Sequence, residues 1–225
     1  MIVVLGIRAA NPGPFTLSGT NTWIVGRDPA WVVDPGPALD EHLDAVAAAV
    51  RERGGAGGIA ITHDHHDHVE GTRGLAERLG GPPVAAARFA DAGVRLADGD
   101  AFGPLEAVAV PGHAPDHLAF VAQATCFSGD AVLGEGSVFV APGPGALAGY
   151  LAALERLRGM GLERICPGHG PEVADPAAKL AEYLAHRRER ERRLLAALAR
   201  GARTQDELLD AVWSDVPPGL RGAAA

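Results

Sequence analysis

A dense run of histidine and aspartate constrains this chain more than any other feature. The run Thr62-His63-Asp64-His65-His66-Asp67-His68 follows the apolar stretch 58–61 and holds four histidines and two aspartates within six residues. Polar groups buried without partners cost several kcal/mol each, so a packed fold can hold this run only if something neutralises it. Neutral imidazole and carboxylate are standard ligands of zinc. The sequence therefore predicts a metal site in a loop that follows a buried strand.

Three further candidate ligands come from distant parts of the chain. His113, Asp130 and His169 each follow an apolar run by one to three residues, and each adjoins a glycine. Glycine lets the backbone turn tightly around a site, and loops at strand ends commonly carry functional residues. We therefore expect these three side chains at the same edge of the fold as the histidine run.

Together with four side chains of the run, these residues make seven candidate metal ligands. The set is His63, His65, Asp67, His68, His113, Asp130 and His169. Seven ligands are too many for one four-coordinate zinc ion, but they suit two metals that share a carboxylate and a water. Such sites activate water as hydroxide. The sequence thus predicts two zinc ions, with iron or manganese as the alternatives.

Apolar periodicity and turn residues predict two rounds of strands and helices. Strands are expected at 22–25, 31–33, 58–61, 83–86, 106–110, 118–122, 125–128 and 165–166, the first two joined as a hairpin across 26–29. Helices are expected at 40–53, around 75–79, at 146–158, at 176–198 after Asp175, and from a capping box at Thr204 through Trp213, before Pro217-Pro218. This order favours an α/β fold in which two sheets pack together with helices outside.

The net charge of −8 is unevenly spread along the chain. Residues 1–178 carry 11 basic and 21 acidic side chains, whereas residues 179–203 carry 8 basic and 3 acidic ones. An acidic body argues against broad nucleic-acid coating, because phosphate binding needs clustered Lys and Arg. The basic segment is expected to be a solvated helix with mixed charges, and a local contact with nucleic acid stays open.

Two further properties bear on the cellular setting. No apolar run approaches the ~20 residues that span a bilayer, and the N-terminal residues do not have the pattern of a signal peptide. Cys126 and Cys166 lie in apolar, strand-like contexts, which fits reduced, buried thiols in a cytoplasmic protein. A homodimer is left open.

The order HxHxDH, PGH, SGD and PGHG resembles the metallo-β-lactamase superfamily of hydrolases over about residues 17–170. That resemblance implies an αββα sandwich with the metals at one edge between the sheets. It implies that His63, His65 and His113 bind the first metal, that Asp67, His68 and His169 bind the second, and that Asp130 bridges them together with a hydroxide. Asp34 would support the ligand loop without binding metal. Asp67 and Asp130 are the residues expected to act in catalysis.

Three shorter segments resemble the β-lactamase-like protein 2 group within that superfamily. They are Asn11–Pro14 with Gly19–Thr22, Gly112–His117 and His186–Glu191. The resemblance implies a hydrolase domain over 1–174 and a helical, winged-helix-like tail over 175–225, with an incomplete wing at Ala225. The human-type member of the group resembles a single-strand endoribonuclease.

Several polar residues near these motifs have plainer interpretations. HxHxDH leaves out Asp64 and His66, which are expected to be spacers. His117, Asn21 and Thr20 are candidates for substrate contact, with structural hydrogen bonds or turns as the alternative. His42 and His186 are expected on helix surfaces.

The chemistry expected is hydrolysis by a metal-bound hydroxide, with no serine nucleophile and no G-x-S-x-G motif. Asp130, where some antibiotic-hydrolysing enzymes have cysteine, and His65, where diiron flavoproteins have glutamate, argue against those branches. What remains is a thioester or other acyl hydrolase of glyoxalase II type (hydroxyacylglutathione hydrolase-like), a lactonase, or a small endoribonuclease that cleaves the phosphodiesters of single-stranded RNA. The acidic body favours a small-molecule ester or thioester, whereas the basic segment and the resemblance to the β-lactamase-like protein 2 group favour RNA. A nucleic-acid-binding or dimerising regulator with a vestigial site is the alternative of another class. Substrate choice is expected in loops around 11–21 and 134–145 and in the tail.

Overall fold

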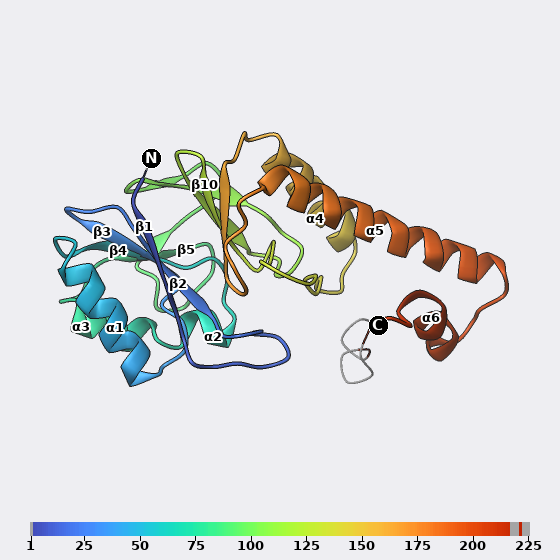
Figure 1. Cartoon of the computed structure of the whole chain (residues 1–225), viewed down its shortest axis with the longest axis horizontal. Helices are drawn as coiled ribbons and strands as arrows, with labels where there is room; N and C mark the ends of the chain where they lie inside the picture. Colours follow the sequence, from blue (N-terminus) through green and yellow to red (C-terminus); the bar gives the residue numbers. More distant parts are fainter. Residues whose placement is uncertain (1, 217–220, 222–225) are drawn as a thin grey trace.

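Two mixed β-sheets face each other in the computed structural model of the chain, which describes residues 2–216 and 221 (Figure 1). The first sheet has the strand order β1-β2-β3-β4-β5-β6. The strands β1 to β3 are antiparallel neighbours, and β3 to β6 run parallel. Their bounds are β1 Val4–Arg8, β2 Asn21–Val25, β3 Ala30–Val33, β4 Ala56–Ala60, β5 Val84–Ala86 and β6 Val94–Arg95.

The second sheet has the order β11-β10-β9-β8-β7. Its strands pair antiparallel except for β10 and β11, which are parallel. Their bounds are β7 Ala101–Phe102, β8 Leu105–Ala109, β9 Leu118–Ala122, β10 Thr125–Gly129 and β11 Arg164–Pro167.

Four helices cover the outer faces of the two sheets, whereas α6 lies away from them (Figure 1). Helices α1 and α3 pack on the first sheet through a cluster that includes Leu43, Leu75 and Ile59. Helices α4 and α5 pack on the second sheet through a cluster that includes Leu154 and Leu180. The bounds are α1 Asp40–Arg51, α2 His66–Val69, α3 Thr72–Arg78, α4 Ala146–Arg158, α5 Pro176–Ala199 and α6 Gln205–Val212.

Alternation along the inner strands explains the layered arrangement. On β10, Phe127 joins the cluster between the sheets, whereas its neighbour Cys126 joins the cluster under α4 and α5. On β2, Trp23 points between the sheets and Ile24 points to the helices of the first sheet. Successive side chains of a strand point to opposite faces, so each apolar strand serves two layers at once. The result is the αββα sandwich that the sequence predicted, with a C-terminal helical segment.

Most elements agree with the sequence-based expectation, and the differences have physical reasons. The edge strands β1, β6 and β7 were not predicted, because they are short or carry a weak apolar pattern. The second half of the histidine run is helical, as α2, and is not a simple loop. His42 was expected on a helix surface, and that was wrong: it is buried, and its Nε2 lies 2.9 Å from Thr22 Oγ1.

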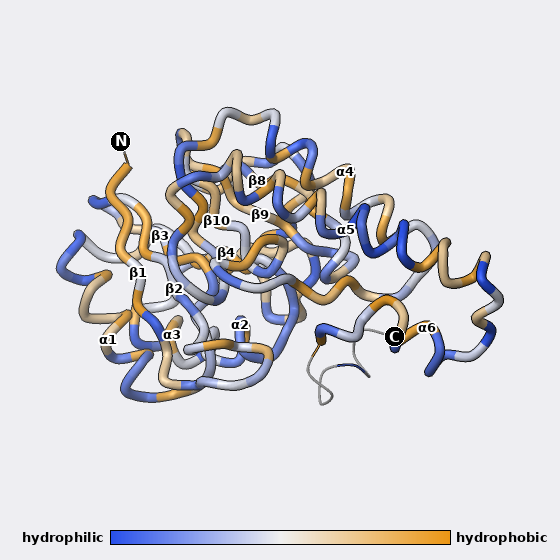
Figure 2. Tube along the Cα trace, turned by 45° about the vertical axis from the view of Figure 1, so that its right-hand side comes forward, coloured by the Kyte–Doolittle hydropathy of each residue, from blue (hydrophilic) through white to orange (hydrophobic). Residues whose placement is uncertain are grey.

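The tail consists of α5 and α6 in the part of the chain that the structure describes. Asp175 caps α5 by accepting from Ala178 N, and Thr204 and Glu207 form the predicted capping box of α6. Figure 2 shows hydrophilic stretches along α5. The end of the expected tail, including Pro217-Pro218 and any wing near Ala225, lies outside the described residues.

Two further expectations concern the thiols and the membrane. Cys126 and Cys166 are free and buried. Among residues 2–216, no helix combines the length and the apolar character that crossing a membrane requires.

Candidate metal centre

The seven predicted ligands meet at one edge of the sandwich. His63 and His65 follow β4, Asp67 and His68 belong to α2, and His113, Asp130 and His169 follow β8, β10 and β11. Strands of both sheets therefore contribute, which explains why residues more than one hundred positions apart converge. The side chains form three overlapping groups whose ligand atoms lie within 4.8 Å of one another: His63-His65-His113, His63-His68-Asp130 and Asp67-His68-His169.

The first group consists of three imidazoles. The Nδ1 atom of His65 lies 3.0 Å from His63 Nε2 and 2.9 Å from His113 Nε2. Three ring nitrogens that converge in this way cannot all be satisfied by hydrogen bonds among themselves. A cation, by contrast, can accept a lone pair from each, since neutral imidazole is a common metal ligand.

The third group, Asp67-His68-His169, brings together one carboxylate and two imidazoles. The Oδ2 atom of Asp67 lies 3.5 Å from His68 Nε2 and 3.2 Å from His169 Nε2. His68 and His169 are buried, while Asp67 is half-buried and reaches the cavity described below. The mixture of one oxygen and two nitrogens is a ligand set that zinc accepts.

Asp130 lies between the first group, His63-His65-His113, and the third group, Asp67-His68-His169. Its Oδ1 is 3.5 Å from His68 Nε2, and its Oδ2 is 3.5 Å from His113 Nε2 and 3.4 Å from His169 Nε2. One carboxylate thus faces histidines from both groups, which is the position that a shared ligand would need.

Glycine at two positions makes this close approach feasible. A Cβ atom on Gly168 would lie 2.5 Å from Asp130 Oδ1 and 2.7 Å from His68 Cε1. Gly129 has φ +48°, and a Cβ there would lie 2.5 Å from Thr62 Oγ1. Larger residues would collide with the centre itself, so the glycines that adjoin the ligands in sequence have a steric reason.

Hydrogen bonds to the far ring nitrogens orient most of the histidines. His68 Nδ1 donates to Asp34 Oδ2 at 2.8 Å, and His113 Nδ1 donates to the carbonyl of Phe139 at 2.9 Å. His169 Nδ1 lies 3.3 Å from the carbonyl of Gly19. In each case the contact fixes the tautomer that leaves Nε2 free to face the centre, and such outer contacts tune a metal ligand.

Asp34 organises the loop that carries the histidines. Its Oδ1 accepts from Thr62 N at 2.8 Å and its Oδ2 from Thr62 Oγ1 at 2.7 Å, in addition to the bond from His68. Thr62 Oγ1 is then free to accept from His63 Nδ1, which lies 2.9 Å away. Asp34 has φ +53°, an unfavourable conformation for a non-glycine residue, and this strain is held in place by those three bonds.

Two buried polar atoms of the candidate ligands have no hydrogen-bond partner in the described part of the chain. They are His68 Nε2 and Asp130 Oδ1, which face each other at 3.5 Å. A buried polar atom without a partner is costly, and a cation between a lone pair and a carboxylate oxygen removes that cost for both. The donor set and these two atoms therefore fit a metal site.

The electrostatics of the centre also call for positive charge. Burial opposes the charged form of His169, but hydrogen bonds to Asp130 and Asp67 outweigh it and raise the pKa to about 9. Burial likewise opposes ionisation of Asp67, yet the hydrogen bond from His169 and the charge of His68 lower its pKa to about 2. Protonated histidine neutralises the negative charge of the carboxylates here. Bound metal ions would neutralise that charge instead, because metal binding displaces protons from the ligands.

His63 differs from these histidines. Burial, together with the neighbouring His68 and His117, holds its pKa well below the usual range. The ring is therefore neutral at physiological pH, and the neutral form is the one that binds metal.

The three residues considered for substrate contact all lie beneath the centre. Thr20 Oγ1 donates to Asp67 Oδ2 at 3.0 Å, and the amide of Asn21 donates to the carbonyls of Pro167 and Gly170. His117 is 1% exposed, and its Nε2 accepts from Asp130 N at 3.1 Å. None of the three lines the cavity in front of the cluster.

The two spacers of the histidine run point away from the centre. Asp64 and His66 are both exposed, and His66 Nε2 lies 3.3 Å from Glu70 Oε1. Neither belongs to any of the three groups of candidate ligands.

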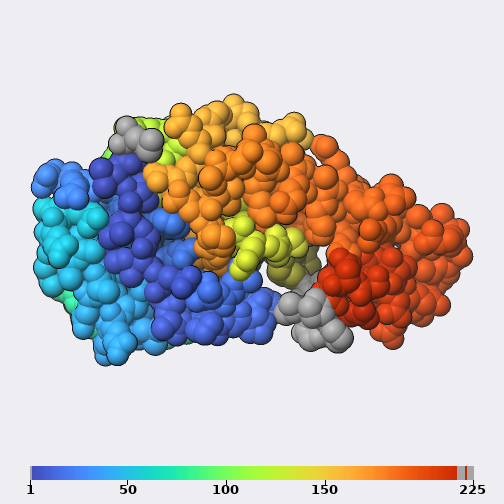
Figure 3. All heavy atoms as spheres, viewed as in Figure 1, coloured from blue at the N-terminus to red at the C-terminus, as the bar shows by residue number. Residues whose placement is uncertain are grey.

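A cavity of about 1250 Å³ opens onto the cluster. His65, Asp67, His113, Asp130 and His169 form part of one wall. Residues of the 11–21 loop, the 134–145 segment and the tail line the rest, and these are the segments in which substrate choice was expected. Figure 3 shows the hollow between the body and the tail.

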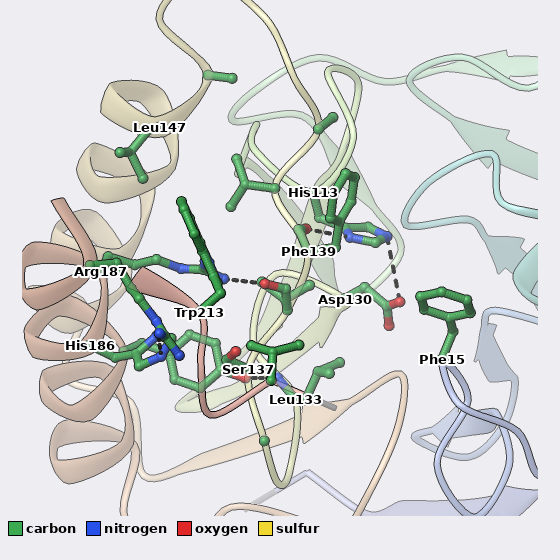
Figure 4. A pocket seen from close by; sticks show the side chains of 18 of the residues that line it. Phe15, His113, Asp130, Leu133, Ser137, Phe139, Leu147, His186, Arg187 and Trp213 are labelled. Carbon is green, nitrogen blue, oxygen red and sulfur yellow. Dashed lines mark hydrogen bonds and ion pairs between the residues drawn. The ribbon is translucent and has the colours of Figure 1, made fainter. Parts of the chain in front are cut away.

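Most of the cavity wall is apolar, and no sequence motif identified it. Figure 4 shows Phe15 beside Asp130 on one side and Trp213 with Arg187 on the other. These residues come from a loop, the end of α6 and α5, so only the tertiary fold brings them together. The sequence signal was limited to the placement of Phe15 and Phe139 in turn-rich segments, and the structure shows both side chains exposed.

Fold and cluster together define an αββα protein with a histidine- and aspartate-rich centre that fits metal. The model of the metallo-β-lactamase superfamily matches residues 15–169. A Caenorhabditis elegans protein named beta-lactamase-like protein 2 homolog is 32% identical over 242 residues, which cover 98% of this chain and 80% of that protein. An Aspergillus chevalieri protein named atrochrysone carboxyl ACP thioesterase is 33% identical over 234 residues, covering 95% of this chain and 74% of that protein.

A solved structure supports the fold independently. The crystal structure of a beta-lactamase domain protein from Burkholderia ambifaria has a TM-score of 0.79 and 22% identity, covering 94% of this chain and 82% of that one. The chain belongs to the metallo-β-lactamase superfamily, and its likeness to the β-lactamase-like protein 2 group is confirmed. It is a hydrolase of that fold with a buried histidine and aspartate cluster.

Proposed function

We propose that this chain hydrolyses acyl thioesters at a centre of two metal ions. The observation that carries the proposal is the apolar cavity that opens onto the cluster. Such a cavity suits an acyl group, because apolar surface gains free energy when it leaves water. When bound, the two metals would supply a hydroxide near neutral pH and offset the negative charge that develops on the attacked oxygen.

The seven ligands divide into two half-sites in this proposal. His63, His65 and His113 hold the first metal, and Asp67, His68 and His169 hold the second. Asp130 serves both, which is supported by its 3.4 to 3.5 Å contacts with histidines of each half. Zinc suits this ligand set best, and iron or manganese are the alternatives.

Asp67 has a second role in the proposal. Its carboxylate is half-buried, lines the cavity and is ionised down to about pH 2. Thr20 donates to one of its oxygens, which holds the side chain in place. An ionised carboxylate at the cavity wall can accept a proton from the attacking water while it remains a ligand.

The cations of the cavity favour a thioester over a phosphodiester. Arg187 donates to the carbonyl of Val138 and lies 5.4 Å over the ring of Tyr150. Arg190 is occupied by Asp215 at 2.7 Å through both terminal nitrogens. Among the described residues that line the cavity, Arg190 is thus neutralised by an ion pair, and Arg187 alone is less than the clustered Lys and Arg that a polyanion needs.

The relative named as an ACP thioesterase supports the same choice. The alternative of a single-strand endoribonuclease rests on the resemblance to the β-lactamase-like protein 2 group and on the basic α5. The alternative of a regulator with a vestigial site has the complete set of seven ligands against it.

The remaining parts of the proposal concern organisation and setting. We keep the division into a hydrolase domain, 1–174, and a tail, 175–225, because α5 begins at Pro176 after the last ligand strand. Free, buried Cys126 and Cys166 favour a reducing compartment such as the cytoplasm.

The test is metal analysis followed by a substrate panel. The panel contains S-lactoylglutathione, a short and a long acyl-CoA, a homoserine lactone, a bis-phosphodiester and a single-stranded RNA. We expect about two metal ions per chain, hydrolysis of the thioesters, and loss of that activity after chelation with recovery on adding metal back. Cleavage of the RNA without hydrolysis of any thioester would refute the proposal in favour of the nuclease.

A further inference from the structure

The far wall of the cavity belongs to the tail. Leu194 and Leu195 of α5, and Trp213 at the end of α6, line the cavity opposite the ligands. In Figure 4 the ring of Trp213 stands between Leu147 and Arg187 and faces the side from which Phe15 projects. The tail therefore completes an enclosure that the hydrolase body alone leaves open.

Exposed apolar side chains concentrate around this enclosure. The described residues include seven large, exposed hydrophobic side chains, and four of them line the cavity: Phe15, Phe139, Leu147 and Leu195. Phe15 is 65% exposed and Leu195 is 60% exposed. A contiguous patch of exposed apolar side chains commonly marks an interaction site, whereas single exposed apolar residues are ordinary.

An ion pair holds the tail wall in position. Arg190 is buried, donates to the carbonyl of Val212 and pairs with both oxygens of Asp215. These two contacts stand on either side of Trp213 in the sequence. Bidentate arginine–carboxylate pairs have defined geometry, so the indole is held over the cavity by a bond from α5.

The size of the cavity indicates what it can hold. Its volume of about 1250 Å³ exceeds the ~300–1,000 Å³ that is usual for small-molecule sites. A lactoyl or acetyl group would leave most of this apolar wall in contact with water. A large apolar acyl group would cover it and would still place its carbonyl carbon at the ligand side.

We propose that Trp213 and Leu195 form an acyl-binding wall through which the tail selects substrates with large apolar acyl groups. The acyl group lies between Phe15 and Phe139 on one side and Trp213 and Leu195 on the other. An aliphatic chain and a fused aromatic ring share the required chemistry. The inference rests on the proposed function, because it names the acyl class that the same centre would process.

The test measures equilibrium binding of carboxylic acids, the products of hydrolysis, to the full-length metal-loaded chain. Trp213 is the reporter, since Trp23 is buried and Trp31 packs edge-on against Phe102 in the body. Acetate, octanoate, dodecanoate and naphthoate are titrated while tryptophan fluorescence is recorded. We expect dissociation constants to fall as the chain lengthens, by up to about fourfold per buried methylene. Naphthoate tests whether a fused aromatic ring binds in the same way.

Matched variants locate the wall. W213D lacks the fluorescent reporter, so its binding is measured by calorimetry, and it should weaken dodecanoate binding at least tenfold, which is the order expected for placing a charge in an apolar site. L195A should weaken it several-fold, whereas L198A, an exposed leucine of the same helix outside the cavity, should bind as wild type. W213F should lose the fluorescence signal and keep affinity by calorimetry, which also guards against misfolding of W213D.

The possible outcomes separate this inference from the proposed function. Equal affinity for acetate and dodecanoate, or equal weakening in L195A and L198A, would overturn the acyl-binding wall. Chain-length-dependent binding without hydrolysis of any thioester would leave the wall standing and refute the proposed reaction. Thioester hydrolysis without chain-length-dependent binding would refute only the wall.

Discussion

The two walls of the cavity are built in opposite ways. On the ligand side, polar side chains follow buried strands, and hydrogen bonds that the histidines donate to Asp34, Phe139 and Gly19 orient their rings. On the tail side, apolar side chains such as Leu195 and Trp213 come from helices that extend from the body, and the specific restraint is the pair between Arg190 and Asp215.

This difference assigns the two walls to different tasks. A directional network fixes atoms to a fraction of an ångström and loses its function when one member changes. Apolar contacts are non-directional, so their shape can vary while the contact persists. The ligand side is therefore suited to determine the reaction, and the tail side is suited to determine which acyl group is accepted.

The largest expected effect belongs to the shared carboxylate. D130A should abolish hydrolysis and reduce bound metal, because Asp130 contacts histidines of both groups. Metal content and turnover are measured on the same sample. D64A is the matched control, since Asp64 is an exposed aspartate of the same region outside the groups. Unchanged turnover in D130A would show that the candidate ligands do not take part in the reaction.

A smaller effect is expected one contact away from the ligands. D34N retains the shape of Asp34 but weakens its bonds to His68 and Thr62, so metal affinity should fall about 10- to 100-fold, as is usual for such outer partners. Competition with a metal-binding dye measures the affinity. Wild-type affinity in D34N would mean that the histidine run orients itself.

The restraint of the tail should affect the Michaelis constant. R190M removes the pair with Asp215 and should raise KM for a long acyl thioester several-fold, with a smaller change in kcat, since it removes binding that precedes the chemistry. R192M is the control, because Arg192 pairs with Glu189 on the exposed surface, where such pairs contribute little. An equal KM in R190M and R192M would show that the ion pair between Arg190 and Asp215 does not contribute to substrate binding.

The smallest change is expected at the thiols of the body. Burial raises the pKa of Cys126 to about 12, so both thiols should resist alkylation at pH 8 until the chain unfolds, and R190M should not alter this. The raised pKa stabilises the folded state below pH 9, and that contribution is lost between about pH 9 and 12. Mass spectrometry after iodoacetamide treatment measures the protection, and rapid labelling in R190M alone would show that the tail supports the body.

The convergence of the candidate ligands could be predicted from the sequence, whereas the tail side could not. The histidine run and the three strand-end residues have polar side chains whose burial without a partner is costly, so their pattern indicates a site before coordinates are known. The roles of Thr20 and Asn21 beneath the centre could not be chosen from sequence, because turn and substrate positions use the same residue types. His42 was misjudged, since its burial depends on Thr22 and Gly36 from other segments.

The tail wall left almost no local signal. Trp213 and Leu195 have the sequence context of ordinary residues in amphipathic helices, and only the packing of α5 on the body and of α6 on α5 turns them toward the centre. The basic character of α5 suggested a nucleic-acid contact, yet Arg188 and Arg193 pair with Glu155 and Glu189. A pairing of this kind depends on the fold, so charge counts along the chain could not reveal it.

The most direct test of the division between the walls is the dependence of kcat/KM on acyl length. A series of acyl-CoA thioesters is assayed with the metal-loaded wild type and with W213D. The account predicts that kcat/KM rises with length in the wild type and that this rise is much shallower in W213D. Identical slopes in the two proteins, or no rise in the wild type, would contradict it.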